Sequence, residues 1–414
     1  MLAGLLIGLV LGVLANLALP SQPWITGLVH YVTEPVGKIF LRLLFMLVIP
    51  LILSALALGV SGLGDVRQLG RIGLKTLAYT VAVSSVAVLI GVGLVNLLQP
   101  GAGLSPALRE RLSAQASAAP AAAPTSGATG ADFVVGLVPN NVVKAMTDGD
   151  MLAIMVFSLL LGIGLALTRT PAARHFEESL QGLYDVVMRL LAIVLQAAPF
   201  GVACLMFTLT ARLGFDVLRQ LGAYVFVVLL ALAIHQFVVY SISVAWLGGM
   251  NPIFFFRSIR DAMVTAFSTA SSNATLPTSL LVAEQNLKLP RHVSRFVLTI
   301  GSTANQNGTA LFEGVTVLFL AQFYGIALTI SQQLSVVFIC ILGGIGTAGV
   351  PAGSIPVVVM ILGMVGVPAE GIGMILGVDR LLDMCRTTLN VTGDLAAAVV
   401  VSRGETETVV SEEG

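Results

Sequence analysis

The segment from Leu376 to Val401 is long and apolar enough to cross a membrane, yet it carries several charged and amide residues. Four of these residues, Asp383, Arg386, Asn390 and Asp394, follow one another at spacings of three, four and four positions. A helix places residues at this spacing on one face. A charged residue at the bilayer centre costs roughly 2.5–3.5 kcal/mol on insertion scales. Such a stripe therefore indicates a buried chamber that holds something polar inside the bilayer.

Composition supports a polytopic membrane protein, because 57% of residues are hydrophobic, 10% are charged and the mean hydropathy is +0.97. The formal net charge is zero, so no basic surface for nucleic acid is expected. Cys204, Cys340 and Cys385 are scattered through apolar segments without metal-ligand spacing, which argues against disulfides and zinc. The histidines are scattered too, and no nucleophile has a base nearby. We expect no enzyme activity and no cofactor other than a coupling ion.

The apolar segments predict an all-helical membrane protein. Candidate spans lie at about 2–19, 39–64, 73–98, 150–168, 182–210, 220–248, 253–285, 292–323, 332–364 and 371–401. The stretch 104–131 is rich in Ala, Pro, Ser and Gly and is typical of a flexible external loop. Residues 403–414 form an acidic tail. The positions of the basic residues predict that both termini are cytoplasmic, in a cell (inner or plasma) membrane.

Two segments are expected to enter the membrane and return on the same side. Segment 253–285 has basic residues on both flanks, whereas 332–364 has none. Each is broken in the middle by small and polar residues, at 268–277 and 343–353. Arms of about 10–15 residues reach about 15–22 Å, near half the bilayer core. One hairpin from each side indicates an inverted repeat. The alternative is two ordinary kinked spans.

The polar cluster 302–309 interrupts the next span and predicts an unwound stretch whose carbonyls and amides coordinate a cation. The alternative is hydrogen bonding between helices. In the last span, Arg386 suits a carboxylate and Asp383 suits an ammonium, so the pair could bind a zwitterion with an additional carboxylate. The alternative is a structural Asp383–Arg386 ion pair that binds nothing. Asn390 and Asp394 could share a hard cation.

Four motifs together carry a resemblance to a known family. They are SSNATLP at 271–277, NQNGT at 305–309, GTAGVP at 346–351 and DMCRTTLNVTGD at 383–394. The chain resembles, over nearly its whole length, the dicarboxylate/amino acid:cation symporter family of glutamate transporter homologues. The resemblance implies eight transmembrane helices, two re-entrant helical hairpins, a homotrimer and an elevator-type mechanism.

The resemblance also divides the chain. Helices one to three would occupy 1–98, an external loop and the start of helix four 99–149, helices four to six 150–250, hairpin one 251–290, helix seven 291–325, hairpin two 326–366, helix eight 367–402 and a cytoplasmic tail 403–414. Part of the first six helices would form a scaffold. The hairpins with helices seven and eight would carry the cargo.

Substrate residues are carried over by motif. Arg386, assisted by Thr309, would take the side-chain carboxylate, Asp383 the amino group, and Asn390 would help hold the α-carboxylate region. The same resemblance adds the hairpin tips and one further residue of the last span: Ser271, Ser272, Asn273, Gly349, Val350 and Thr387. Asp383 favours a substrate with an amino group, and Arg386 favours an acidic one.

Cation sites are implied in the same way, with sodium favoured over protons because Asp394 is retained. One site would use Asp394 with carbonyls of Gly301, Asn305 and Asn390. Another would use Thr303 with carbonyls of Gly344, Ile345 and Thr347. The family's usual NMDGT motif reads NQNGT here, so Asn307 replaces a sodium-ligating aspartate. With Thr80 and Val83 at ligand positions and Ser84 retained, a third site is expected to be altered or missing.

These features together predict a secondary active symporter of acidic amino acids, aspartate or glutamate, embedded in the lipid bilayer. The alternative within the family is a proton-coupled carrier, or a carrier of neutral amino acids or C4-dicarboxylates. A channel is a weaker alternative, because buried Asp383 and Asp394 would repel anions from this path.

Overall fold

Every element of the part of the chain that the structure describes is helical. The computed structural model describes residues 2–18, 22–61, 70–102, 138–148, 150–168, 170–214, 216–346, 353–368 and 371–405. The helices of the first half are α1 (Leu2–Ala18), α2 (Pro23–Leu28), π-helical η1 (Val29–Thr33), α3 (Glu34–Phe45), α4 (Val48–Ser61), α5 (Gly70–Leu98), α8 (Val142–Asp148), α9 (Met151–Leu167), α10 (Pro171–Gln196) and α11 (Ala198–Leu213).

The second half continues with a long helix that contains two π-helical turns, and then with shorter helices. They are α12 (Asp216–Ile234), η3 (His235–Val239), α13 (Tyr240–Ile242), η4 (Ser243–Leu247), α14 (Pro252–Ser258), α15 (Arg260–Thr269), α16 (Ser272–Gln285), α17 (Arg291–Ala304), α18 (Asn307–Phe323), α19 (Ile330–Gly346), α20 (Ile355–Met364) and α21 (Ile372–Ser402).

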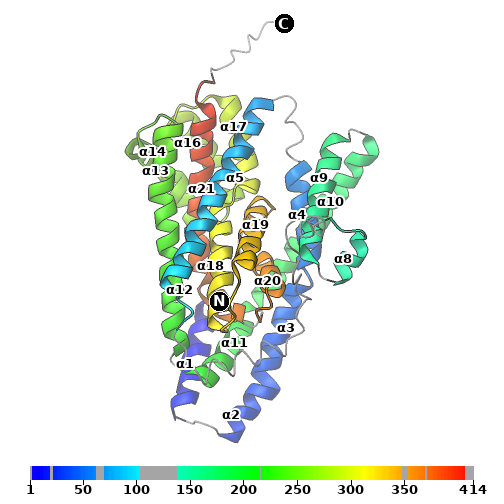
Figure 1. The fold of residues 1–414 in the computed structure, drawn as a ribbon, viewed down its shortest axis with the longest axis vertical. Helices are drawn as coiled ribbons and strands as arrows, with labels where there is room; N and C mark the ends of the chain where they lie inside the picture. Colours follow the sequence, from blue (N-terminus) through cyan, green and yellow to red (C-terminus); the bar gives the residue numbers. More distant parts are fainter. Residues whose placement is uncertain are drawn as a thin grey trace.

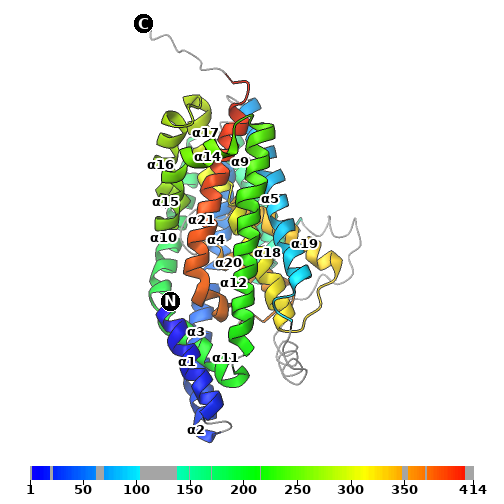
Figure 2. The same ribbon diagram turned by 90° about the vertical axis from the view of Figure 1, so that its left-hand side faces the viewer.

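The helices pack in two groups (Figure 1). In the first, α1 packs on α11, α4 packs on α9 and α10, and α3 packs on α11. In the second, α18 and α21 are surrounded by α5, α12, α15, α16, α17 and α19. The two groups touch where α1 and α11 meet α21 and where α3 and α4 meet α19 and α20. Figure 2 shows α21 and α12 side by side along the length of the second group.

Helix α18 lies at the centre of the second group. Every residue from Asn307 to Ala321 is buried, so the helix has no face toward solvent or lipid. A helix that is apolar on nearly all sides requires such a position. The consequence is that the few polar residues of α18 must find partners inside the protein.

Length and composition identify three helical stretches that could cross a membrane: Pro23–Ser61, Arg71–Leu98 and Val217–Leu247. A fourth would be the pair α10 and α11, if this bent pair is one span. Shorter apolar helices are Ala3–Ala18, Ala153–Leu167, Ile330–Ile345 and Ile355–Met364. The helical class therefore agrees with the expectation from composition.

Two spans differ from those expected. The helical stretch expected at 39–64 begins at Pro23, because α2, η1 and α3 run on into it. The span expected at 182–210 is two helices that meet at an angle of 55°. The break lies at Ala197, two residues before Pro199. Proline lacks the backbone N–H that would continue the first helix, so the chain turns here.

Three features position the polar interior. Helices α15 and α16 pack against each other on either side of Ala270, which has a left-handed backbone with φ +50°. Helices α17 and α18 are separated by Asn305 and Gln306, whose backbones are not helical. This break is shorter than the unwound stretch expected at 302–309. Helices α19 and α20 pack against each other, and the tip between them lies outside the described residues.

Candidate functional site

The charged stripe of α21 points into the protein. Its members are nearly inaccessible, with exposed fractions of 1–4%: Asp379, Asp383, Arg386, Asn390 and Asp394. On the opposite face of the same helix, Arg380 and Leu381 are exposed. Buried charges must be paired or hydrogen-bonded, so the partners of this stripe define the site.

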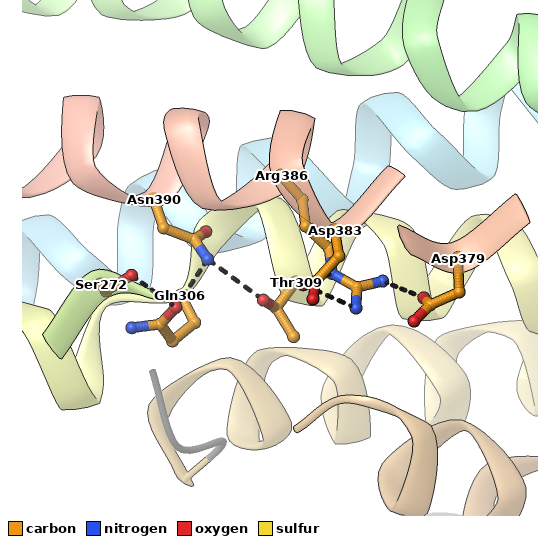
Figure 3. Close-up of polar contacts among 7 residues, drawn as sticks. All are labelled: Ser272, Gln306, Thr309, Asp379, Asp383, Arg386 and Asn390. Atoms are coloured by element: carbon orange, nitrogen blue, oxygen red, sulfur yellow. Dashed lines mark hydrogen bonds and ion pairs between the residues drawn. The ribbon is translucent and has the colours of Figure 1, made fainter. Parts of the chain in front are cut away.

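Arg386 is held by two carboxylates of its own helix (Figure 3). Its Nη1 lies 2.9 Å from Asp379 Oδ1, and its Nη2 lies 2.9 Å from Asp383 Oδ1. Its Nε donates to Asp383 Oδ1 at 3.0 Å, and Cζ lies 4.1 Å from the centre of the Phe312 ring. The ion pair with Asp383 that the sequence left open is therefore present, and Asp379 joins it. When all three groups are ionised, Asp379, Asp383 and Arg386 together carry one net negative charge, and the guanidinium lies over the Phe312 ring.

Gln306, in the break between α17 and α18, connects four elements (Figure 3). Its Oε1 accepts from Asn390 Nδ2 at 2.6 Å and from Ser272 Oγ at 3.4 Å. Its Nε2 donates to the Ser302 carbonyl at 2.8 Å, and its backbone N–H donates to the Gly344 carbonyl at 3.0 Å. One residue thereby joins α16, α17, α19 and α21.

Asn390 connects this junction to the start of α18. Its Nδ2 also donates to Thr309 Oγ1 at 3.2 Å, and its Oδ1 accepts from the Gly308 backbone N–H at 2.7 Å. A Cβ on Gly308 would come within 2.7 Å of the Arg386 carbonyl oxygen. Glycine at this position therefore permits the close approach of α18 and α21.

Asp394 lies beside the same break, in a setting rich in oxygen. Its Oδ1 accepts from Asn305 Nδ2 at 2.9 Å, and a Cβ on Gly301 would stand 2.5 Å from this oxygen. The Asn305 Oδ1 is buried and has no hydrogen-bond partner within the described ranges. A buried carboxylate next to an unsatisfied amide oxygen suits a hard cation.

Asn307 forms the middle of a directed chain of hydrogen bonds. Ser84 Oγ donates to Asn307 Oδ1 at 2.5 Å, and Asn307 Nδ2 donates to Tyr240 Oη at 3.0 Å. Tyr240 Oη donates to the Leu389 carbonyl at 3.2 Å. The chain joins α5, α18, α13 and α21 without any net charge. Both ends of the Asn307 amide are thereby used.

The three residues predicted at the first hairpin tip, Ser271, Ser272 and Asn273, differ in their contacts. Ser271 caps α16 by accepting from the Ala274 backbone N–H at 3.2 Å, and Ser272 is buried and reaches Gln306. Asn273 is exposed and is not brought to the stripe. Ser271 is itself only 8% exposed.

The remaining predicted residues lie at different depths. Thr80, Val83 and Thr387 are buried, Gly344 is buried against Gln306, and Ile345 is half-buried. Thr303 is exposed and donates to the Ile300 carbonyl at 3.0 Å. Thr347, Gly349 and Val350 lie outside the described residues.

Three contact residues had no assigned role before the structure: Asp379, Gln306 and Phe312. Asp379 precedes Arg386 by seven positions, a helical spacing that could have placed it on the same face. Gln306 and Phe312 meet the stripe only through tertiary packing. No group of three or more His, Cys, Asp and Glu side chains suited to a metal ion occurs in the described part of the chain.

A bundle of apolar helices around a buried stripe of charges and amides defines a membrane protein with a polar interior. Comparison with known proteins gives its family. The model of the sodium:dicarboxylate symporter family matches residues 1–404, and the chain belongs to this family.

Several relatives align over nearly the whole chain. The "Proton/sodium-glutamate symport protein" of Geobacillus stearothermophilus is 34% identical over 402 residues, 96% of this chain and 93% of the relative. The "Proton/glutamate-aspartate symporter" of Escherichia coli K12 is 35% identical over 405 residues, 98% and 92% of the two chains. The rat "Excitatory amino acid transporter 2" is 31% identical over 463 residues, 99% of this chain and 79% of the relative.

Proposed function

We propose that this protein is a secondary active symporter that carries aspartate or glutamate together with cations, with sodium as the favoured coupling ion. The observation that carries the proposal is Arg386, a buried guanidinium (1% exposed) held between Asp379 and Asp383 inside the helical bundle. A buried arginine whose partners are carboxylates can exchange one of them for the carboxylate of a ligand.

The exchange would proceed at Asp379, the more distant of the two partners in sequence. A substrate carboxylate that replaces Asp379 at Nη1 keeps Arg386 neutralised, and Thr309 Oγ1 adds a hydrogen bond. Asp383 would then receive the substrate ammonium. The tip residues Ser271 and Ser272, with Asn273, Gly349, Val350 and Thr387, would complete the pocket.

Asn390 and Gln306 link substrate to cation. Asn390 would hold the α-carboxylate region while Gln306 fixes its amide. A sodium ion beside Asp394 would take the free Asn305 Oδ1 and backbone carbonyls of Gly301 and Asn390, all oxygen ligands. The second site would use Thr303 with carbonyls of Gly344, Ile345 and Thr347. The Gly344 carbonyl already accepts from Gln306, so cation binding there would act directly on this junction.

A third cation site is proposed to be missing. The Asn307 amide, at the position of a family aspartate, is satisfied by Ser84 and Tyr240 without charge. The Asn307 amide has no charge to balance a buried cation, and its oxygen already accepts a hydrogen bond from Ser84. Thr80 and Val83 lie on the same helix as Ser84, and Val83 has no oxygen to offer.

Proton coupling is the second candidate for the driving ion. One matched relative is named for both "proton" and "sodium", and another for "proton" alone. The uncharged hydrogen-bond chain through Asn307 also supports fewer sodium ions. Among substrates, Asp383 disfavours a C4-dicarboxylate without an amino group, and Arg386 disfavours a neutral amino acid.

The proposed architecture is that of an elevator-type transporter, with one fixed scaffold and one mobile unit. α1 to α4 and α9 to α11 would form the scaffold of a homotrimer, and α5 with α12 to α21 the mobile unit. The separate packing of these two groups supports this division. The paired helices α15 and α16, and α19 and α20, would be the two re-entrant hairpins, within eight transmembrane helices and with both termini cytoplasmic.

Uptake of labelled aspartate into proteoliposomes tests the function, with sodium and proton gradients imposed separately. Accumulation driven by the sodium gradient, and competition by glutamate but not by succinate or alanine, is the expected result. Accumulation driven only by protons would identify the second candidate. Absence of gradient-driven accumulation of either acidic amino acid would refute the proposal.

A further inference from the structure

We propose that the groove between α16 and α17 binds the headgroup of an anionic phospholipid. The groove has a volume of about 490 Å³ and is lined by residues near the end of α16 and the start of α17. Figure 1 shows these two helices at one end of the bundle. Its lining combines apolar, acidic and basic side chains: Leu280, Leu281, Glu284, Gln285, Arg295 and Thr299. The transport function does not use any of them.

The carboxylate of Glu284 contacts the guanidinium groups of both Arg291 and Arg295. Arg295 Nε donates to Glu284 Oε1 at 2.9 Å, and Arg291 Nε lies 3.4 Å from Glu284 Oε2. The Glu284 side chain is 18% exposed, whereas those of Arg291 and Arg295 are 72% and 64% exposed. Glu284 contacts each arginine at Nε, and both arginine side chains are largely exposed. They present the planar donors that suit a phosphate.

Basic residues beside the groove outnumber its one carboxylate. Arg295 lines the groove with Glu284, Arg291 Nε lies 3.4 Å from Glu284, and Lys288 is exposed in the turn that joins the two helices. Basic residues at the ends of membrane helices mark the cytoplasmic side, where anionic lipids concentrate. The net positive charge of Lys288, Arg291, Arg295 and Glu284 taken together and the expected negative charge of that leaflet are therefore complementary.

The floor of the groove favours a lipid over a soluble anion. Leu281 is 52% exposed and Leu280 is half-buried beside it, so an apolar surface lies next to the paired arginines. A free phosphate would leave this surface uncovered. An acyl chain would cover it while the phosphate meets the Nη atoms, which is the arrangement of a lipid at a membrane interface.

The test measures lipid binding and not transport, so it is independent of the proposed substrate. The protein is reconstituted in phosphatidylcholine vesicles with increasing phosphatidylglycerol, extracted, and scored for retained phosphatidylglycerol by native mass spectrometry. At about 1 kcal/mol per basic residue near the surface, Arg291→Gln/Arg295→Gln is expected to weaken retention about 30-fold. The matched pair Arg257→Gln/Arg260→Gln, exposed residues that do not line the groove, is expected to retain lipid like the parent.

Two further measurements keep the proposal testable if the double variant does not fold. Leu281→Gln leaves Glu284 and both arginines intact and is expected to lower retention about 3- to 10-fold through its apolar contact alone. Inorganic phosphate is added as a competitor. Equal retention by the two double variants, parental retention by Leu281→Gln, or full displacement by millimolar phosphate would each overturn the proposal.

Discussion

Replacing Arg386 by alanine separates the structural role of this residue from its role in binding. In the parent, the guanidinium neutralises Asp379 and Asp383 at 2.9 Å each, and all three side chains are buried. Arg386→Ala leaves two carboxylates without their cation. Breaking a buried ion pair from one side costs about 3–5 kcal/mol of folding free energy. Loss of the arginine–carboxylate contact should also weaken substrate binding by about 30-fold or more.

The double variant Asp379→Asn/Arg386→Ala distinguishes these two effects. It restores the single excess negative charge of the parent cluster, so the thermal unfolding midpoint in detergent should recover part of the loss. Aspartate binding, measured by calorimetry, should remain absent because the guanidinium is still missing. Arg380→Ala is the matched control, since Arg380 lies on the exposed face of the same helix. Its effect on stability should stay within about 0.5 kcal/mol.

Three results would contradict these expectations. If Arg386→Ala takes up aspartate with the KM of the parent, Arg386 does not bind the substrate. If Arg380→Ala and Arg386→Ala lower the unfolding midpoint equally, the buried ion pairs do not determine the difference. Recovery of both stability and binding in the double variant would show that Asp379, and not the arginine, decides affinity.

Four further predictions test the cation sites, the junction and the C-terminal end. Asp394→Asn should abolish the stimulation of aspartate binding by sodium, whereas Asp261→Asn, at an exposed position on α15, should leave the sodium titration unchanged. Asn307→Asp should add one sodium ion per substrate in flux measurements, because a carboxylate supplies charge and cannot donate to Tyr240; an unchanged stoichiometry would contradict this. Gln306→Met removes the acceptor of Asn390 and Ser272 and should weaken aspartate binding by about 1–3 kcal/mol, read from calorimetry. Hydrogen bonds from Lys75 and Arg71 lower the pKa of Glu405, so Glu405→Gln should reduce the unfolding midpoint at neutral pH, and its difference from the parent should vanish as the pH falls through that lowered pKa.

The sequence predicted those parts of the site that depend on one helix. The spacing of Asp383, Arg386 and Asp394 determines a common face once the segment is helical, and composition required that face to be buried. The interruption at Asn305 and Gln306 was also foreseeable, since amides serve poorly in an apolar helix. The helical class followed from the length of the apolar segments.

Contacts between elements could not be predicted in the same way. The bonds of Gln306 to Ser272, Asn390 and Gly344 join positions up to 84 residues apart in the chain. Such contacts depend on how helices cross, which no local pattern specifies. The bend at Ala197 was missed because the apolar composition continues through it, although Pro199 is a local signal.

The junction at Gln306 has a mechanical consequence. Its backbone N–H is anchored to the Gly344 carbonyl on α19, and its side chain restrains Asn390 on α21. An outward movement of α19 relative to α18 would either break the hydrogen bond at the Gly344 carbonyl or displace residue 306. Under the proposed function, movement of α19 would therefore also disturb the acceptor of Asn390.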